Sequence, residues 1–135
     1  MNELSIKEQC LIEIFRAFLF LEKEGYEIFN ITYGGRELPS IIYKNKKTKI
    51  QVWIIGSEID HHIVISRQKL LAFKKESYVF DISDYYKYFF CGMIKARHYT
   101  LFQQAKFIQT YLMKIIKGDL WITQLFPPLS RGCKK

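Results

Sequence analysis

Between residues 26 and 67 the chain carries four short segments rich in β-branched and aromatic residues, joined by links of turn-forming residues. A parallel connection between neighbouring strands needs a crossover of about a dozen residues or more, and none of these links is that long. Consecutive segments should therefore pair as antiparallel neighbours, which predicts a β-meander. The expected strands are Tyr26–Tyr33, Ser40–Lys44, Lys49–Ile55 and His61–Arg67, with Ser77–Ile82 a candidate fifth.

Apolar and polar residues alternate along these segments, which predicts a sheet with one dry face and one wet face. The dry face should carry Ile41, Tyr43, Ile50, Val52, Ile54, Ile63 and Ile65. The wet face should carry Lys44, Lys49, Gln51 and His62, with Trp53 shared at its edge. A sheet with one apolar face usually buries that face against helices.

Two amphipathic helices flank the strand-rich region, and each begins at a capping-box sequence. Ser5 with Glu8 forms the first box, and Thr100 with Gln103 forms the second. We expect one helix over Ile6–Glu24, closed by Gly25, and another from Leu101 up to Gly118. A third, short helix is expected over Tyr85–Lys95.

The expected architecture is an α+β domain, an antiparallel β-meander of four to five strands with an N-terminal and a C-terminal helix packed on one face. Each helix has one apolar stripe, so the cheapest arrangement buries both stripes on the dry face of the sheet. The predicted core joins Phe15, Phe18, Leu112 and Ile115 to Val52, Ile54, Ile63 and Ile65. Residues 1–125 should form this single domain and residues 126–135 a loosely held basic tail.

Composition fits a chain that folds unaided, since 49% of its 135 residues are hydrophobic and 16% are aromatic. The longest apolar run near the start, Ala17–Leu21, is far short of the roughly 20 residues of a membrane span, and Met1–Glu8 does not resemble a secretion signal. The three cysteines are odd in number and widely spaced, so neither a disulfide framework nor a zinc site is indicated. We therefore expect a cytoplasmic protein.

The net charge of +8 is unevenly distributed along the chain. Residues 1–40 hold seven acidic and four basic residues, a net charge of −3, which leaves +11 for the remainder. No acidic residue occurs from Tyr85 through Gly118. Such a surface should attract an acidic partner, although lysines at hairpin tips and on solvated helix faces are also ordinary solubility devices. The candidate partner-binding residues are Lys44, Lys46, Lys47, Lys49, Tyr85, Tyr86, Lys87, Tyr88, Lys106, Lys114 and Lys117.

No arrangement of residues predicts catalysis or a cofactor. Glu58, Asp60, His61 and His62 form the one cluster of groups suited to metal or acid–base chemistry. Adjacent residues on a strand point to opposite faces, so the two imidazoles cannot easily share one ion. Gly34-Gly35 lies between strands rather than before a helix, which suits a turn better than a phosphate loop. We expect a protein that is not an enzyme and that has no metal site.

Five short stretches carry a resemblance to a known class of proteins. They are Phe20–Tyr26 (FLEKEGY), Ile42–Asn45 (IYKN), Ile50–Ile54 (IQVWI), Ile63–Arg67 (IVISR) and Leu112–Asp119 (LMKIIKGD). In this order they resemble the small immunity proteins, and immunity-like proteins, of bacterial polymorphic and contact-dependent toxin systems, over about residues 12–67 and 100–119. The resemblance implies a non-enzymatic cytoplasmic protein that binds and neutralises a cognate toxin domain.

The basic charge separates two hypotheses about the partner. Inhibitors of basic nuclease toxins are typically acidic, so an immunity protein with this charge should face an acidic toxin domain rather than a nuclease. The alternative is a small nucleic-acid-binding protein that contacts phosphates through Lys44–Lys49 and the late helix. Neither hypothesis involves a membrane.

Overall fold

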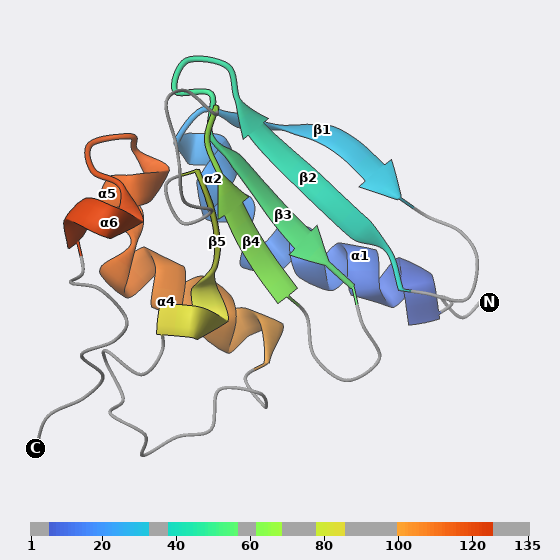
Figure 1. Cartoon of the computed structure of the whole chain (residues 1–135). Coiled ribbons are helices and arrows are strands. Elements are labelled where there is room, and N and C mark those ends of the chain that lie inside the picture. Colours follow the sequence, from blue (N-terminus) through green and yellow to red (C-terminus); the bar gives the residue numbers. More distant parts are fainter. Residues whose placement is uncertain (1–5, 33–37, 57–61, 69–77, 86–99, 126–135) are drawn as a thin grey trace, which may run out of the picture.

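The strand-rich region forms a five-stranded antiparallel sheet in the order β1-β2-β3-β4-β5 (Figure 1). The computed structural model describes residues 6–32, 38–56, 62–68, 78–85 and 100–125. Its strands are β1 (Tyr26–Thr32), β2 (Ser40–Asn45), β3 (Gln51–Ile55), β4 (His62–Ser66) and β5 (Val79–Asp81). Each strand pairs with the next in the chain, so the predicted meander is confirmed, including its fifth strand.

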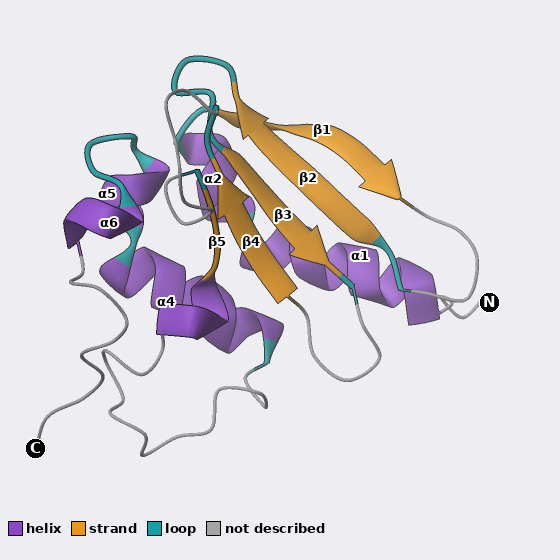
Figure 2. Ribbon diagram, in the orientation of Figure 1, coloured by secondary structure: helices purple, strands orange, loops and turns teal. Residues whose placement is uncertain are grey.

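The helices come before and after the sheet in the chain. They are α1 (Ile6–Ala17), α2 (Leu19–Lys23), the 3₁₀ helix η2 (Ile82–Tyr85), α4 (Leu101–Tyr111), α5 (Met113–Ile116) and α6 (Ile122–Leu125). Figure 2 shows α1 and α2 behind the sheet, and α4 contacts α1. An α+β fold with helices against one face of the meander is therefore confirmed. None of the helices in the described ranges is long and apolar enough to cross a membrane.

The apolar alternation correctly predicts which sheet face is buried. Ile41, Tyr43, Ile50, Val52, Ile54, Ile63 and Ile65 all lie in the core. Phe18, Leu112 and Ile115 join them, as predicted. Phe15 does not, because its side chain is 36% exposed. With 3.6 residues per turn, the buried stripe of α1 runs through Cys10, Ile14 and Ala17, and Phe15 is rotated away from it.

Both long predicted helices are interrupted, each at a buried apolar residue. Phe18 separates α1 from α2 with φ −108° and ψ 18°, and Leu112 separates α4 from α5 with φ −113° and ψ 10°. The chain continues in each case through a tighter turn, in which the amides of Leu21 and Ile115 donate to the carbonyls of Phe18 and Leu112 at 3.0 Å. The short helices that follow thereby direct Leu21 and Ile115 into the core.

The start of α4 follows the predicted capping box. Gln103 N donates to Thr100 Oγ1 at 3.1 Å, and Thr100 N donates to Gln103 Oε1 at 2.8 Å. The box satisfies amides that have no partner within the helix, which fixes where α4 begins. Ser5, half of the other predicted box, lies outside the described residues, as do residues 86–95 of the expected helix over Tyr85–Lys95 and the tail from residue 126.

Candidate functional site

The face of the sheet opposite α1 and α2 carries a row of apolar side chains across three strands. Ile42 on β2 lies opposite Trp53 on β3, and Trp53 lies opposite Val64 on β4. Ile42 and Val64 are half-buried, whereas Trp53 is 39% exposed. We call this surface the open sheet face. An exposed tryptophan at the middle of an apolar row is the kind of residue that dominates the energy of protein interfaces.

A cationic groove adjoins this row at one end. The neighbouring row of the same face is polar, since Lys44, Gln51 and Ser66 occupy successive strands in register. A hollow of about 450 Å³ opens there, and we call it the sheet groove. Among the residues that the structure describes, its lining consists of Lys44, Lys49, Gln51, Trp53, Ser66, Arg67, Gln68, Tyr78 and Val79. Three of these residues are cationic and none is acidic, so the groove favours an anionic ligand.

The indole of Trp53 is held in place by its neighbour on the same strand. Trp53 Nε1 donates to Gln51 Oε1 at 2.8 Å. Because the single polar group of the indole is satisfied within the chain, the exposed part of the ring is apolar surface that needs no polar partner. The open sheet face thus presents an oriented aromatic ring beside the cations of the sheet groove.

Lys49 enters the groove from an unfavourable backbone conformation. Its φ is 66°, and it is the only residue other than glycine with positive φ in the described ranges. The conformation closes the β2–β3 hairpin, where Lys49 N donates to Asn45 O at 2.8 Å and Asn45 N donates to Ile50 O at 2.9 Å. A side chain in this region costs about 1–2 kcal/mol, which glycine would avoid. Strain of this kind concentrates at functional sites.

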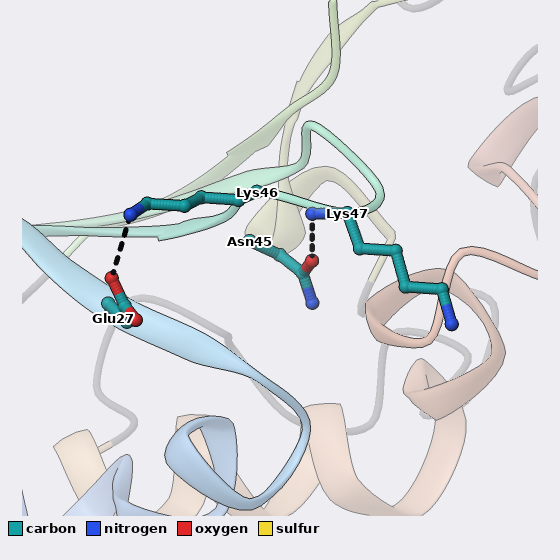
Figure 3. Close-up of polar contacts among 4 residues, drawn as sticks. All are labelled: Glu27, Asn45, Lys46 and Lys47. Atoms are coloured by element: carbon teal, nitrogen blue, oxygen red, sulfur yellow. Dashed lines mark hydrogen bonds and ion pairs between the residues drawn. The ribbon is translucent and has the colours of Figure 1, made fainter.

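Asn45 anchors the hairpin tip to the rest of the fold (Figure 3). Its buried amide donates from Nδ2 to Glu24 O at 3.0 Å, and its Oδ1 accepts from Lys47 N at 2.9 Å and from Thr48 N at 3.1 Å. Thr48 in turn packs so closely on Gly118 that a Cβ there would lie 2.8 Å from Thr48 Cγ2. The tip is therefore clamped between the ends of α2 and α5.

The four lysines around the tip do not act as one cluster. Lys46 Nζ lies 3.7 Å from Glu27 Oε2 in an exposed pair, and Lys46 and Lys47 extend in opposite directions (Figure 3). Lys44 Nζ lies 5.0 Å from the centre of the Phe29 ring. Of the four, only Lys44 and Lys49 line the sheet groove. An exposed pair such as Lys46–Glu27 contributes little to stability.

The remaining predicted partner-binding residues are dispersed. Lys114 and Lys117 are exposed on and just after α5, and Lys106 lies on the helix side of the molecule. Tyr85 is not on the surface, because it is only 5% exposed and its ring meets Phe80 edge-on at 5.5 Å between centroids. Its expected role at a partner surface is therefore corrected to a role in the core. Tyr86, Lys87 and Tyr88 lie outside the described residues.

The sequence reasoning missed Arg67 and Tyr78 as site residues and placed Trp53 only at the edge of the wet face. Alternation carried a usable signal for Trp53, since Val52 and Ile54 on either side of it are buried. Arg67 follows β4, and its guanidinium lies 4.5 Å from the centre of the Trp121 ring. That contact joins residues far apart in the chain, so no local sequence pattern predicts it.

The groups considered for metal or acid–base chemistry are only partly described. His62 lies on the open sheet face, with Nδ1 3.5 Å from Asp81 Oδ2, while Glu58, Asp60 and His61 lie outside the described residues. Within residues that the structure describes, no group of three or more His, Cys, Asp or Glu side chains could hold a metal ion.

Most of the perturbed titratable groups lie in the core, whereas at the sheet groove burial lowers the pKa of the Arg67 guanidinium. Burial, followed by the charge of Glu13, raises the pKa of the Cys10 thiol. Burial, followed by the charge of Glu22, raises the pKa of Tyr43 to about 12. Burial also raises the pKa of Tyr26, whose hydroxyl donates to Ile116 O at 2.7 Å. The raised pKa values keep the Cys10 thiol and the two tyrosine hydroxyls protonated, and these groups form part of the core.

The chain matches no protein-family model, and no significant match was found among curated proteins or solved structures.

Proposed function

We propose that this chain is a non-enzymatic binding protein that docks an acidic surface of a partner protein through its open sheet face. One observation carries the proposal: the exposed, oriented ring of Trp53 lies at the centre of an apolar row and borders a groove whose described lining residues include three cations and no acidic residue. Protein interfaces commonly combine an aromatic, apolar centre with a polar rim. That rim would consist of Lys44, Lys49 and Arg67, whose positive charges would favour a partner surface of negative charge.

The resemblance to immunity proteins supplies the class of partner. In this proposal the partner is an acidic bacterial toxin domain, met in the cytoplasm, and binding covers the active site or the entry path of that domain. The clamped hairpin tip supports this assignment, because a surface fixed before binding loses little conformational entropy on docking.

The test is co-expression with the toxin domain encoded by a neighbouring reading frame. We expect restored growth of the host and a complex that survives size-exclusion chromatography. Trp53→Ala should weaken that complex about 30-fold or more, the scale of a hot-spot residue. Tyr111→Ala is the matched control, since it removes an exposed aromatic ring from α4 and should leave affinity unchanged. Absence of both rescue and complex would contradict the proposal.

A second function, binding of single-stranded nucleic acid, is favoured by one feature of the same groove. Trp53 and Tyr78 line it together with three cations, and aromatic rings flanked by cations can stack bases while contacting phosphates. Labelled oligothymidine and oligouridine at about 50 mM salt are suitable probes, since phosphate contacts are strong at low salt. A mobility shift lost in Trp53→Ala would favour nucleic acid, and no shift would remove this function.

A further inference from the structure

A second hollow lies on the helix side of the molecule, between α1–α2 and α4. It has a volume of about 380 Å³, and we call it the helix hollow. Ala17 of α1 and Ala105 of α4 are both buried in its lining, and their small side chains let the two helices approach closely. Larger apolar side chains rise around them, Leu19 and Phe20 from one side and Phe102 from the other. The hollow thus has a narrow floor and apolar walls.

The apolar walls are open to solvent. Leu19 is 52% exposed and Phe102 is 51% exposed. Exposed apolar side chains that face a common hollow, rather than being scattered singly, mark a binding surface. The core beneath is complete without them, because Phe18, Leu21 and Ile108 fill it.

Cations lie on both sides of the helix hollow. Arg16 and Lys23 line it from the N-terminal helices and Lys106 lines it from α4, and none of the described lining residues is acidic. Among the residues that the structure describes, none of these three cations forms an ion pair with a carboxylate. An occupant that carries carboxylates on both sides of an apolar stripe would pair with these three cations, which form no ion pair with a described carboxylate.

We propose that the helix hollow is a second binding site, which takes an acidic amphipathic segment of a partner protein. Two apolar side chains three or four residues apart on a helix would enter the hollow, and carboxylates beside them would reach Arg16, Lys23 and Lys106. The helix itself, about 10 Å across, would lie over the hollow rather than inside it.

Two other occupants fit the observations less well. A lipid surface needs apolar side chains that protrude from a convex face, whereas Leu19, Phe20 and Phe102 surround a hollow. A second copy of the chain, docked with its helix hollow against this one, would bring three cations against three cations without an anion between them. The site is also separate from the sheet groove, because the two lie on opposite sides of the sheet.

The probe is a fluorescein-labelled peptide of about 15 residues, near the length at which isolated helices become stable, with leucines at helical spacing and glutamates elsewhere. We expect a rise in fluorescence anisotropy with the full chain. The same peptide with lysines in place of glutamates should not bind. Phe102→Ala and Lys106→Glu should each weaken the glutamate peptide about tenfold or more, a loss of about 1.4 kcal/mol.

Two variants separate this site from general charge attraction and from the sheet groove. Lys114→Glu makes the same change of charge on an exposed position of α5 outside the hollow, and Trp53→Ala alters only the open sheet face. Both should change affinity by less than about twofold. No binding by wild type, equal binding of the lysine peptide, or equal loss in Lys114→Glu and Lys106→Glu would overturn the proposal.

The two other occupants are tested directly. Flotation with phosphatidylglycerol–phosphatidylcholine vesicles should leave the protein unbound, and sedimentation velocity should show no self-association that depends on Phe102. Vesicle binding that is lost in Lys106→Glu would overturn the proposal in favour of a lipid surface. A dimer that is lost in Phe102→Ala would overturn it in favour of a second copy.

Discussion

The sheet groove and the helix hollow lie on opposite sides of one core, and they are built in different ways. The sheet groove follows from strand register, which puts Lys44, Gln51 and Ser66 side by side once β2, β3 and β4 pair. The helix hollow follows from a contact between α1 and α4, which begin about a hundred residues apart in the chain. Local pairing rules produce the first surface, and only the tertiary fold produces the second.

The two surfaces also differ in how firmly their cations are held. Lys49 projects from a hairpin clamped by Asn45 and packed on Gly118, so its backbone is fixed. Arg16, Lys23 and Lys106 project from the outer sides of helices, where long side chains keep most of their rotamer freedom. We therefore expect the sheet groove to be the more selective surface and the helix hollow to accept a wider range of sequences.

Leu112→Ala should give the largest effect, because Leu112 supports both surfaces. Its side chain is fully buried at the junction of α4 and α5, within the cluster that includes the dry face of the sheet. Loss of a buried leucine leaves a cavity and should cost about 2–5 kcal/mol of unfolding free energy. Urea unfolding should show one transition, with the same lowered midpoint by tryptophan fluorescence and by far-UV circular dichroism.

Lys114→Ala is the control for that experiment, since Lys114 is exposed two positions later in the chain. Its midpoint should stay close to that of the wild type. Two separate transitions in Leu112→Ala would show that the sheet and the late helices do not share one cooperative core.

Asn45→Ala should have the next largest effect and should act on the sheet groove alone. The change removes three hydrogen bonds and leaves Glu24 O, Lys47 N and Thr48 N without these partners. Unpaired groups of this kind cost about 1–3 kcal/mol. Hydrogen exchange should accelerate in the β2–β3 hairpin and not in α4. Asn30→Ala, at an exposed position on β1, is the control, and faster exchange in α4 would contradict this assignment.

The sequence predicts the sheet well because strand period and link length are local properties. All seven residues assigned to the dry face are buried, and the second capping box is present as expected. The helix breaks at Phe18 and Leu112 could not be foreseen, since neither residue is a helix breaker and the bend serves packing on a distant surface. Trp121 was missed for the same reason, although its ring meets Phe80 at 5.3 Å in the core.

Prediction of the site was less successful, because positive charge along the chain does not say which lysines converge. Lys44 and Lys49 reach one groove, whereas Lys46 is turned toward Glu27 and Lys106 faces the helix side. Tyr85 resembles an interface residue by composition and proves to be core, because η2 folds its ring against Phe80. Burial of an aromatic residue in an irregular segment depends on contacts that no periodicity encodes.

Lys49→Gly should give the smallest change in stability and the most informative one. Glycine accepts a φ of 66° without strain, so the variant loses that cost but gains freedom in the unfolded chain, and a net stabilisation of up to about 1 kcal/mol should remain. The same change removes a cation from the sheet groove and should weaken binding of the acidic partner, while the glutamate peptide at the helix hollow should bind as before.

Lys47→Gly is the matched control, because Lys47 is a neighbouring tip lysine that lacks positive φ and does not line the groove. It should stabilise nothing and leave partner affinity unchanged. A protein that becomes more stable while binding less well would mean that the strained lysine is kept for its side chain, and unchanged affinity would reduce Lys49 to an ordinary turn residue.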